Sequence, residues 1–128
     1  MAKTIISSEQ APAAIGPYSQ GVAVGPLVFF SGQIPVDPKT GQLVSGGIVA
    51  QTEQVIKNMA AMLEAAGFTF QNVVKTTIFL TDLEDFGTVN DIYGRCFAAS
   101  PPARACVQVA ALPKGAAIEI EWIASELA

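Results

Sequence analysis

The chain has 128 residues, of which 11 are acidic and 7 are basic, so its formal net charge is −4 and its pI is near 4.6. A chain of this length builds one hydrophobic core, and we expect a single domain over residues 1–128. Histidine is absent, which excludes Ser-His-Asp triads, Cys-His dyads and His-based metal sites. The excess of acidic over basic residues, and the absence of any run of Lys or Arg, argue against nucleic-acid binding.

Charged residues make up only 14% of the chain and hydrophobic residues 51%, against about 25% charged residues in an average soluble domain. A small domain has too much surface to cover with so few charges, so we expect part of that surface to lie against other subunits. The apolar runs are too short to span a membrane, and no signal-peptide pattern follows Met1. We therefore expect a cytoplasmic protein without membrane association, whose two cysteines stay reduced.

The N-terminal third of the chain is predicted to contain a loop, two strands and a turn. Residues 7–26 are rich in Pro, Gly, Ser and Ala, which predicts a loop that leads into a short strand near residues 22–24. Residues 27–34 are aromatic and β-branched and are followed by Pro35, which predicts a second strand. The segment 37–41 (Asp-Pro-Lys-Thr-Gly) predicts a turn. Gly46-Gly47 lacks the Lys-Ser/Thr of a phosphate-binding loop and is interpreted as a linker into a helix.

Two helices follow from hydrophobic spacing. From Val49 to Ala66 apolar residues recur at steps of three and four, and Gly67 is a natural C-cap. The second helix is predicted over residues 86–97, because acidic residues precede it and Pro101-Pro102 ends it. Strands are predicted over residues 73–81, 104–110 and 117–124. The turn at residues 112–115 would join the last two as a hairpin, giving an α+β fold with both helices on one face of a β-sheet.

Strand alternation allows the faces of the last two strands to be predicted. Arg104, Cys106 and Gln108 share one face of their strand, and Glu119 and Glu121 share one face of theirs. If the intervening apolar residues meet the helices, these five polar side chains lie together on the uncovered face. That face can equally be a plain solvated surface.

A hairpin would place Arg104 and Glu119 on neighbouring strands. A guanidinium can bind a ligand carboxylate through two parallel hydrogen bonds, and a glutamate can activate a water molecule. This pair therefore favours a site for a small acidic metabolite, although a structural ion pair would use the same residues. Cys106 is interpreted as an inert, half-buried thiol, because no histidine is present to activate it.

Several segments carry a resemblance to a known family. They are Ala14–Gln20, Ser31–Ile34, Val73–Thr77, Phe86–Tyr93, Pro102–Arg104, Ala111–Gly115 and Ile118–Glu121. Together they resemble the motifs of the YjgF/RidA family, in order and over essentially the whole chain. The resemblance implies a chorismate-mutase-like α+β fold, with a mixed β-sheet and two helices packed on one face, and a homotrimer with ligand clefts between adjacent subunits.

The resemblance also implies an activity: the hydrolysis of short 2-imino acids, such as 2-iminobutanoate and 2-iminopropanoate, to 2-oxo acids and ammonia. Such imines arise from pyridoxal-phosphate-dependent dehydratases, so the reaction would detoxify their products, and it would need no metal or organic cofactor. By this resemblance Arg104 would clamp the substrate carboxylate, and Glu119 would activate the attacking water or pass its proton to the departing amine. The residues implied to close, line or brace the cleft are Tyr18, Ser31, Gly32, Phe86, Asn90 and Cys106.

Two other functions stay open at this stage. A trimer with carboxylate clefts could bind 2-oxo acids without catalysis or act as a chaperone-like protein. Members of this family have also been labelled ribonucleases, but the net charge of −4 and the absence of histidine argue against RNA cleavage.

Overall fold

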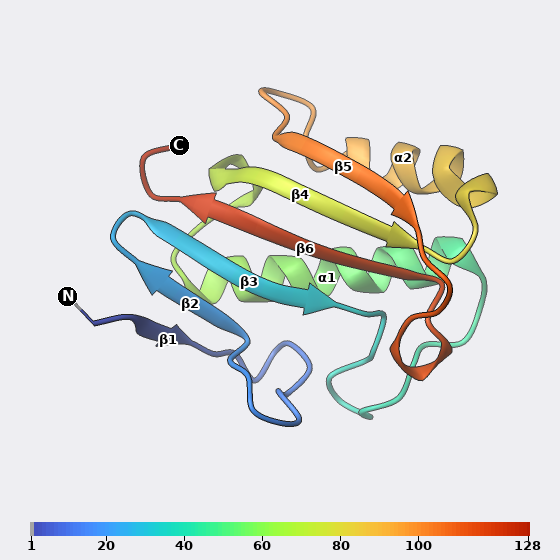
Figure 1. Ribbon diagram of the computed structural model, residues 1–128, viewed down its shortest axis with the longest axis horizontal. Helices are drawn as coiled ribbons and strands as arrows, with labels where there is room; N and C mark the ends of the chain where they lie inside the picture. The colour runs from blue at the N-terminus through green and yellow to red at the C-terminus, as the bar shows by residue number, and fades with distance from the viewer. Residues whose placement is uncertain (1) are drawn as a thin grey trace.

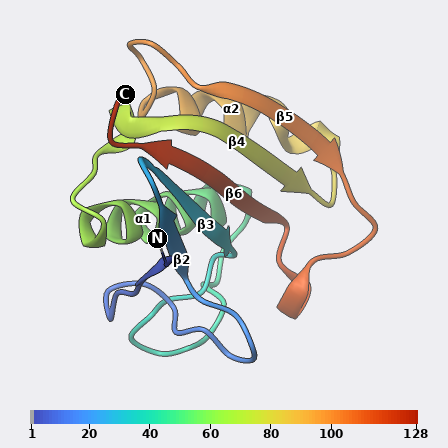
Figure 2. The ribbon, with the colours of Figure 1, turned by 60° about the vertical axis from the view of Figure 1, so that its left-hand side comes forward.

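The computed structural model describes residues 2–128 and contains one mixed β-sheet with two α-helices (Figure 1). The strands are β1 (Thr4–Ile6), β2 (Gly21–Val24), β3 (Leu27–Gln33), β4 (Val73–Leu80), β5 (Ala103–Gln108) and β6 (Ile118–Ser125). The helices are α1 (Ile48–Ala65) and α2 (Phe86–Gly94), with short 3-10 turns η1 (Phe70–Asn72), η2 (Leu83–Asp85) and η3 (Pro113–Gly115). Both helices cover the same face of the sheet (Figure 2), which confirms the predicted α+β class.

The strand order in the sheet is β1-β2-β3-β6-β4-β5. All neighbouring strands are antiparallel except β4 and β5, which are parallel. The predicted hairpin between the last two strands is therefore wrong, because β4 lies between β5 and β6. The cause is α2: it links β4 to β5 as a crossover helix, and a crossover connection of this kind returns the chain parallel to the strand it left.

The local predictions for α1 are confirmed. The helix begins one residue before Val49 and ends at Ala65, and Gly67 follows it with φ +78°, a conformation that glycine adopts without strain. The second helix is shorter than predicted: α2 ends at Gly94, and the 3-10 turn η2 precedes it. In η2 the Asp82 carboxylate accepts a hydrogen bond from the Glu84 backbone N–H at 2.9 Å. The short strand β1 was not predicted.

The hydrophobic core lies between the helices and the covered face of the sheet. The ring of Phe30 stacks on that of Trp122, with centroids 4.7 Å apart, at the centre of this layer. The largest fully buried apolar side chains are Trp122, Met59, Met62, Leu63, Ile78, Leu80, Ile118, Ile120, Val55 and Val89. The opposite face, which no helix covers, also carries apolar side chains: Phe29 is 42% exposed and Val107 is 43% exposed. Both faces of this sheet are therefore apolar in part.

Candidate functional site

Arg104 lies on β5 at one edge of the sheet, on the face that the helices cover. Its ladder partner on β4 is Thr76, and the next pair on the same face is Cys106 with Ile78. Thr76 and Ile78 are both fully buried beneath the helices. Because paired residues in a ladder point to the same face, Arg104 and Cys106 point to the helix side, as does Gln108. The prediction that Arg104, Cys106 and Gln108 lie on the uncovered face is wrong.

Glu119 and Glu121 do lie on the uncovered face, as predicted. They alternate along β6 with the buried residues Ile118, Ile120 and Trp122. Arg104 and Glu119 thus occupy opposite faces of one sheet, with β4 between their strands. This arrangement excludes the structural ion pair that the sequence left open within one chain, and it equally excludes a small-molecule site that one chain builds from these two residues alone.

The guanidinium of Arg104 is exposed but firmly held. Its Nη1 donates a hydrogen bond of 2.7 Å to Oδ1 of Asn90 on α2. Its central carbon lies 5.3 Å from the ring centroid of Phe86 and 5.1 Å from that of Tyr93, both on α2. Aromatic faces attract a cation at such distances. Because the hydrogen-bond acceptor is a neutral amide, this bond leaves the positive charge of Arg104 available to an anion.

A surface hollow of about 440 Å³ adjoins this arginine. Its lining residues are Asn90, Tyr93, Gly94, Phe97, Pro101, Pro102 and Arg104. Cys106, two residues further along β5, is half-buried and packs against the core. Burial raises the pKa of the Cys106 thiol, and the nearby Arg104 charge offsets this rise only in part. The thiol is therefore kept protonated, which agrees with the interpretation of Cys106 as an inert residue.

Glu119 packs against Gly32 on β3. The pairing of β3 with β6 shifts register between Phe30 and Gln33, and the Glu119 side chain occupies the space beside Gly32. A Cβ added to Gly32 would lie 2.9 Å from Cδ and 3.1 Å from Cγ of Glu119, so only glycine leaves room for this carboxylate. Burial raises the pKa of Glu119, and the neighbouring carboxylate of Glu121 raises it further.

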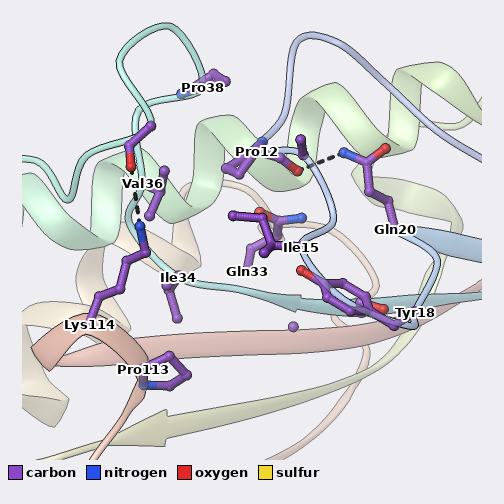
Figure 3. A pocket seen from close by; sticks show the side chains of 14 residues that line it. Pro12, Ile15, Tyr18, Gln20, Gln33, Ile34, Val36, Pro38, Pro113 and Lys114 are labelled. Carbon is purple, nitrogen blue, oxygen red and sulfur yellow. Dashed lines mark hydrogen bonds between the residues drawn. The ribbon is translucent and has the colours of Figure 1, made fainter.

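Tyr18, Ser31 and Gly32 line a second cavity of about 300 Å³, which lies between the loop that precedes β2 and the segment at the end of β3 (Figure 3). The Ser31 hydroxyl donates a hydrogen bond of 2.6 Å to the carbonyl of Ser19, which ties β3 to the loop that carries Tyr18. The side chain of Tyr18 is 53% exposed. Tyr18 therefore lies at an open surface, within reach of a molecule that enters the cavity.

The sequence did not predict the other residues of this cavity. Pro12, Ile15, Pro38 and Pro113 give it a largely apolar lining. Lys114 also lines it and donates a hydrogen bond of 3.3 Å to the carbonyl of Gly41, so the η3 turn is joined to the 37–41 turn. Lys114 (φ +60°) and Gly115 adopt the positive φ values of a tight turn, which agrees with the turn predicted at residues 112–115. Nothing local in the sequence indicates which loop this turn contacts.

The predicted site residues thus fall into two groups. Tyr18, Ser31 and Gly32 lie around the cavity beside β3, with Glu119 against Gly32, and Phe86, Asn90, Arg104 and Cys106 lie at the β5 edge. No helix within residues 2–128 is long and apolar enough to cross a membrane. The same residues contain no cluster of three or more Cys, Asp or Glu side chains arranged to hold a metal ion.

Comparison with known proteins shows which family the chain resembles. The family model described as Endoribonuclease L-PSP matches residues 8–126. A mouse protein named 2-iminobutanoate/2-iminopropanoate deaminase is 56% identical over 95% of this chain and 90% of its own.

Among solved structures, a Rid-family protein of Yersinia pestis (YyfA) is 50% identical with a TM-score of 0.94, covering 97% of this chain and 99% of its own. The Escherichia coli protein TdcF, solved with bound serine, is 46% identical with a TM-score of 0.91, covering 96% and 98%. Matches that span nearly the full length of both partners leave no large segment of this chain unaccounted for. The chain therefore belongs to the YjgF/RidA family, whose family model carries the description Endoribonuclease L-PSP.

Proposed function

We propose that this protein hydrolyses short 2-imino acids, such as 2-iminobutanoate and 2-iminopropanoate, to 2-oxo acids and ammonia, at clefts between the subunits of a homotrimer. The observation that carries the proposal is the guanidinium of Arg104. It is exposed, it is held by Asn90 and two aromatic rings, and its charge is free to bind an anion. Relatives named as deaminases of this substrate class support the choice of substrate.

The position of the two proposed catalytic groups supports an assembly in which neighbouring subunits share a site. In a 2-imino acid the carboxylate and the imine carbon are bonded to one another, so the group that binds one must lie close to the group that attacks the other. Arg104 and Glu119 of one chain are on opposite faces of the sheet. A site that uses both therefore takes Arg104 from one subunit and Glu119, with Tyr18 and Gly32, from its neighbour. The uncovered, partly apolar sheet face is the surface we assign to this contact.

The proposed reaction uses only water and proton transfers. Arg104 binds the substrate carboxylate through two parallel N–H···O hydrogen bonds. Glu119 accepts a proton from a water molecule as the water oxygen adds to the carbon of the protonated imine, which gives a carbinolamine with one hydroxyl and one amine group. Glu119 then returns the proton to the amine nitrogen, the C–N bond breaks and ammonia leaves, and the carboxylate accepts the hydroxyl proton as the C=O bond of the 2-oxo acid forms.

The environment of Glu119 suits this role. A carboxylate whose pKa is raised towards neutrality accepts and returns a proton more readily than an ordinary surface glutamate. The raised pKa of Glu119, caused first by burial and then by Glu121, moves the group in that direction. Gly32 leaves the room that this carboxylate itself occupies.

A coupled assay tests the proposal. A threonine dehydratase generates 2-iminobutanoate in place, and the rate of 2-oxobutanoate release is measured with and without this protein. Arg104→Lys keeps the charge but loses the planar fork, so we expect affinity to fall about 10- to 150-fold, the value of a charge-assisted hydrogen bond of about 1.5–3 kcal/mol. Glu119→Gln should retain 2-oxobutanoate binding and slow turnover by about 10²–10⁴-fold.

Arg95→Lys is the matched control, because Arg95 is exposed at the end of α2 and should tolerate the same substitution. Full activity of Arg104→Lys would refute the carboxylate clamp. Binding of 2-oxobutanoate without acceleration of imine loss would support the non-catalytic binding protein instead. Because the family model is described as an endoribonuclease, the assay includes RNA, and RNA cleavage that disappears in Arg104→Lys, without acceleration of imine loss, would support a ribonuclease instead.

A further inference from the structure

A buried hydrogen bond lies directly beneath the Arg104 guanidinium. The hydroxyls of Thr76 on β4 and Tyr93 on α2 are 2.7 Å apart. Thr76 is fully buried and Tyr93 is 4% exposed. Neither residue was among the site residues predicted from the sequence, and neither lines the cavity beside β3.

The position of this bond connects it to Arg104 in two ways. Thr76 is the ladder partner of Arg104, so the two side chains leave adjacent strands side by side. The ring of Tyr93 lies 5.1 Å from the guanidinium carbon. Tyr93 is thus fixed at both ends: its backbone belongs to α2, and its hydroxyl is hydrogen-bonded to Thr76 on β4. The aromatic face between those two ends contacts the Arg104 guanidinium. In Figure 1, α2 lies behind β5 at this edge of the sheet, on the side from which the Tyr93 hydroxyl reaches Thr76.

Burial raises the pKa of the Tyr93 hydroxyl, and the hydrogen bond with Thr76 offsets the rise only in part. The phenol therefore stays protonated at neutral pH and remains able to share its hydrogen with Thr76. Burying a phenol hydroxyl is costly unless the hydroxyl is hydrogen-bonded. Phenylalanine would fill the same space in the core without that cost.

We propose that Tyr93, held by Thr76, is a positioning residue that fixes the plane of the Arg104 guanidinium. With Nη1 engaged by Asn90 and one face supported by Tyr93, the remaining N–H groups are held in one orientation. A fork fixed in this way binds a carboxylate at a lower entropic cost than a freely rotating side chain does. This inference deepens the proposed function and rests on it, because the orientation matters only if Arg104 binds the substrate carboxylate.

The test uses two substitutions that remove the same bond from opposite ends. Tyr93→Phe keeps the ring and loses the hydroxyl, and Thr76→Val keeps the volume and loses the hydroxyl. We expect each to raise KM for the imine and Kd for 2-oxobutanoate about three- to tenfold, the value of one net hydrogen bond. We expect kcat to stay within about twofold, because carboxylate binding is shared by ground state and transition state. The double variant should be no weaker than either single one.

The matched control is Thr52→Val on α1. Thr52 is also fully buried, but its hydroxyl has no hydrogen-bond partner within residues 2–128 and it lies on another element. We expect this variant to leave KM, kcat and Kd unchanged. Urea unfolding of all variants measures how much each substitution costs the fold, so that loss of folded protein is not counted as loss of affinity.

An Arg104→Ala background separates the possible failures. If Tyr93 acts through Arg104, adding Tyr93→Phe to Arg104→Ala leaves Kd for 2-oxobutanoate as it is in Arg104→Ala. If Arg104→Ala weakens binding but Tyr93→Phe weakens it by the same further factor, the positioning role is overturned and the clamp survives. Unchanged Kd in Tyr93→Phe also overturns the positioning role. If Arg104→Ala leaves Kd unchanged, the clamp itself fails, and the positioning role fails with it.

Discussion

The separation of Arg104 and Glu119 predicts that two inactive variants restore each other. Arg104 pairs with Thr76 and Glu119 pairs with Phe79, three residues further along β4. With about 3.3 Å per residue along a strand and about 4.8 Å between strands, the two Cα atoms are about 14 Å apart, with side chains on opposite faces. One chain therefore cannot bring both groups to one small molecule. Arg104→Ala and Glu119→Ala chains should complement when they assemble together.

The expected recovery can be calculated. In a one-to-one mixture of the two variants, a shared site is intact only if its arginine comes from a Glu119→Ala chain and its glutamate from an Arg104→Ala chain. Random assembly satisfies both conditions at about one quarter of the sites, so we expect about one quarter of wild-type activity. The variants are unfolded together, refolded and assayed for 2-oxobutanoate release, and native mass spectrometry confirms that the chains have mixed.

Two controls define the result. Each variant refolded alone should be inactive, and Arg104→Ala refolded with the Arg104→Ala/Glu119→Ala double variant should also be inactive, because no chain then supplies an arginine. Mixed assemblies that form in the expected proportions but stay inactive would refute the shared site. Arg104 and Glu119 would then not serve the same site.

Two further predictions concern the surroundings of Glu119. Glu119 must be ionised to act as a base, so the rate should fall as the pH drops through the raised pKa of Glu119. Glu121→Gln removes the like charge that helps to raise this pKa, so the acidic limb of the pH–rate profile should move to lower pH. An acidic limb that does not move would contradict the coupling between the two carboxylates. Gly32→Ala should displace the Glu119 carboxylate and lower kcat at least tenfold with little loss of stability, because the clashing group is the end of a flexible side chain. Gly87→Ala, at a helical position where the new methyl meets nothing within 4 Å, should keep full activity, and equal losses in both variants would contradict the steric argument.

Much of the fold could be predicted because its signals are local. The spacing of apolar residues from Val49, together with the left-handed Gly67, defines α1 within a residue or two. On β6 the alternation of Glu119 and Glu121 with buried residues gave the correct face, because charged and apolar side chains separate cleanly there. Such patterns need no knowledge of which strand lies next to which.

The position of β5 could not be predicted from its own residues. Ala105 and Val107 were expected to meet the helices because they are the apolar set of the strand, yet Val107 is 43% exposed on the uncovered face. That face is itself partly apolar, so hydrophobicity does not distinguish the two sides of this strand. The proximity of the last two strands in the sequence suggested a hairpin, whereas the parallel pairing of β5 with β4 depends on the path of α2, which is a long-range property. The division of the site between two faces followed from that single difference.

The prolines that precede β5 have a consequence for the exposed edge of the sheet. An edge strand exposes unpaired backbone N–H and C=O groups, and another chain can add to them and extend the sheet without limit. Pro101 and Pro102 stand immediately before β5, and neither can donate a backbone hydrogen bond. The edge open to such strand addition therefore begins no earlier than Ala103, the first residue of β5. A short edge bounded by prolines limits the length over which the strand of another chain could pair with β5.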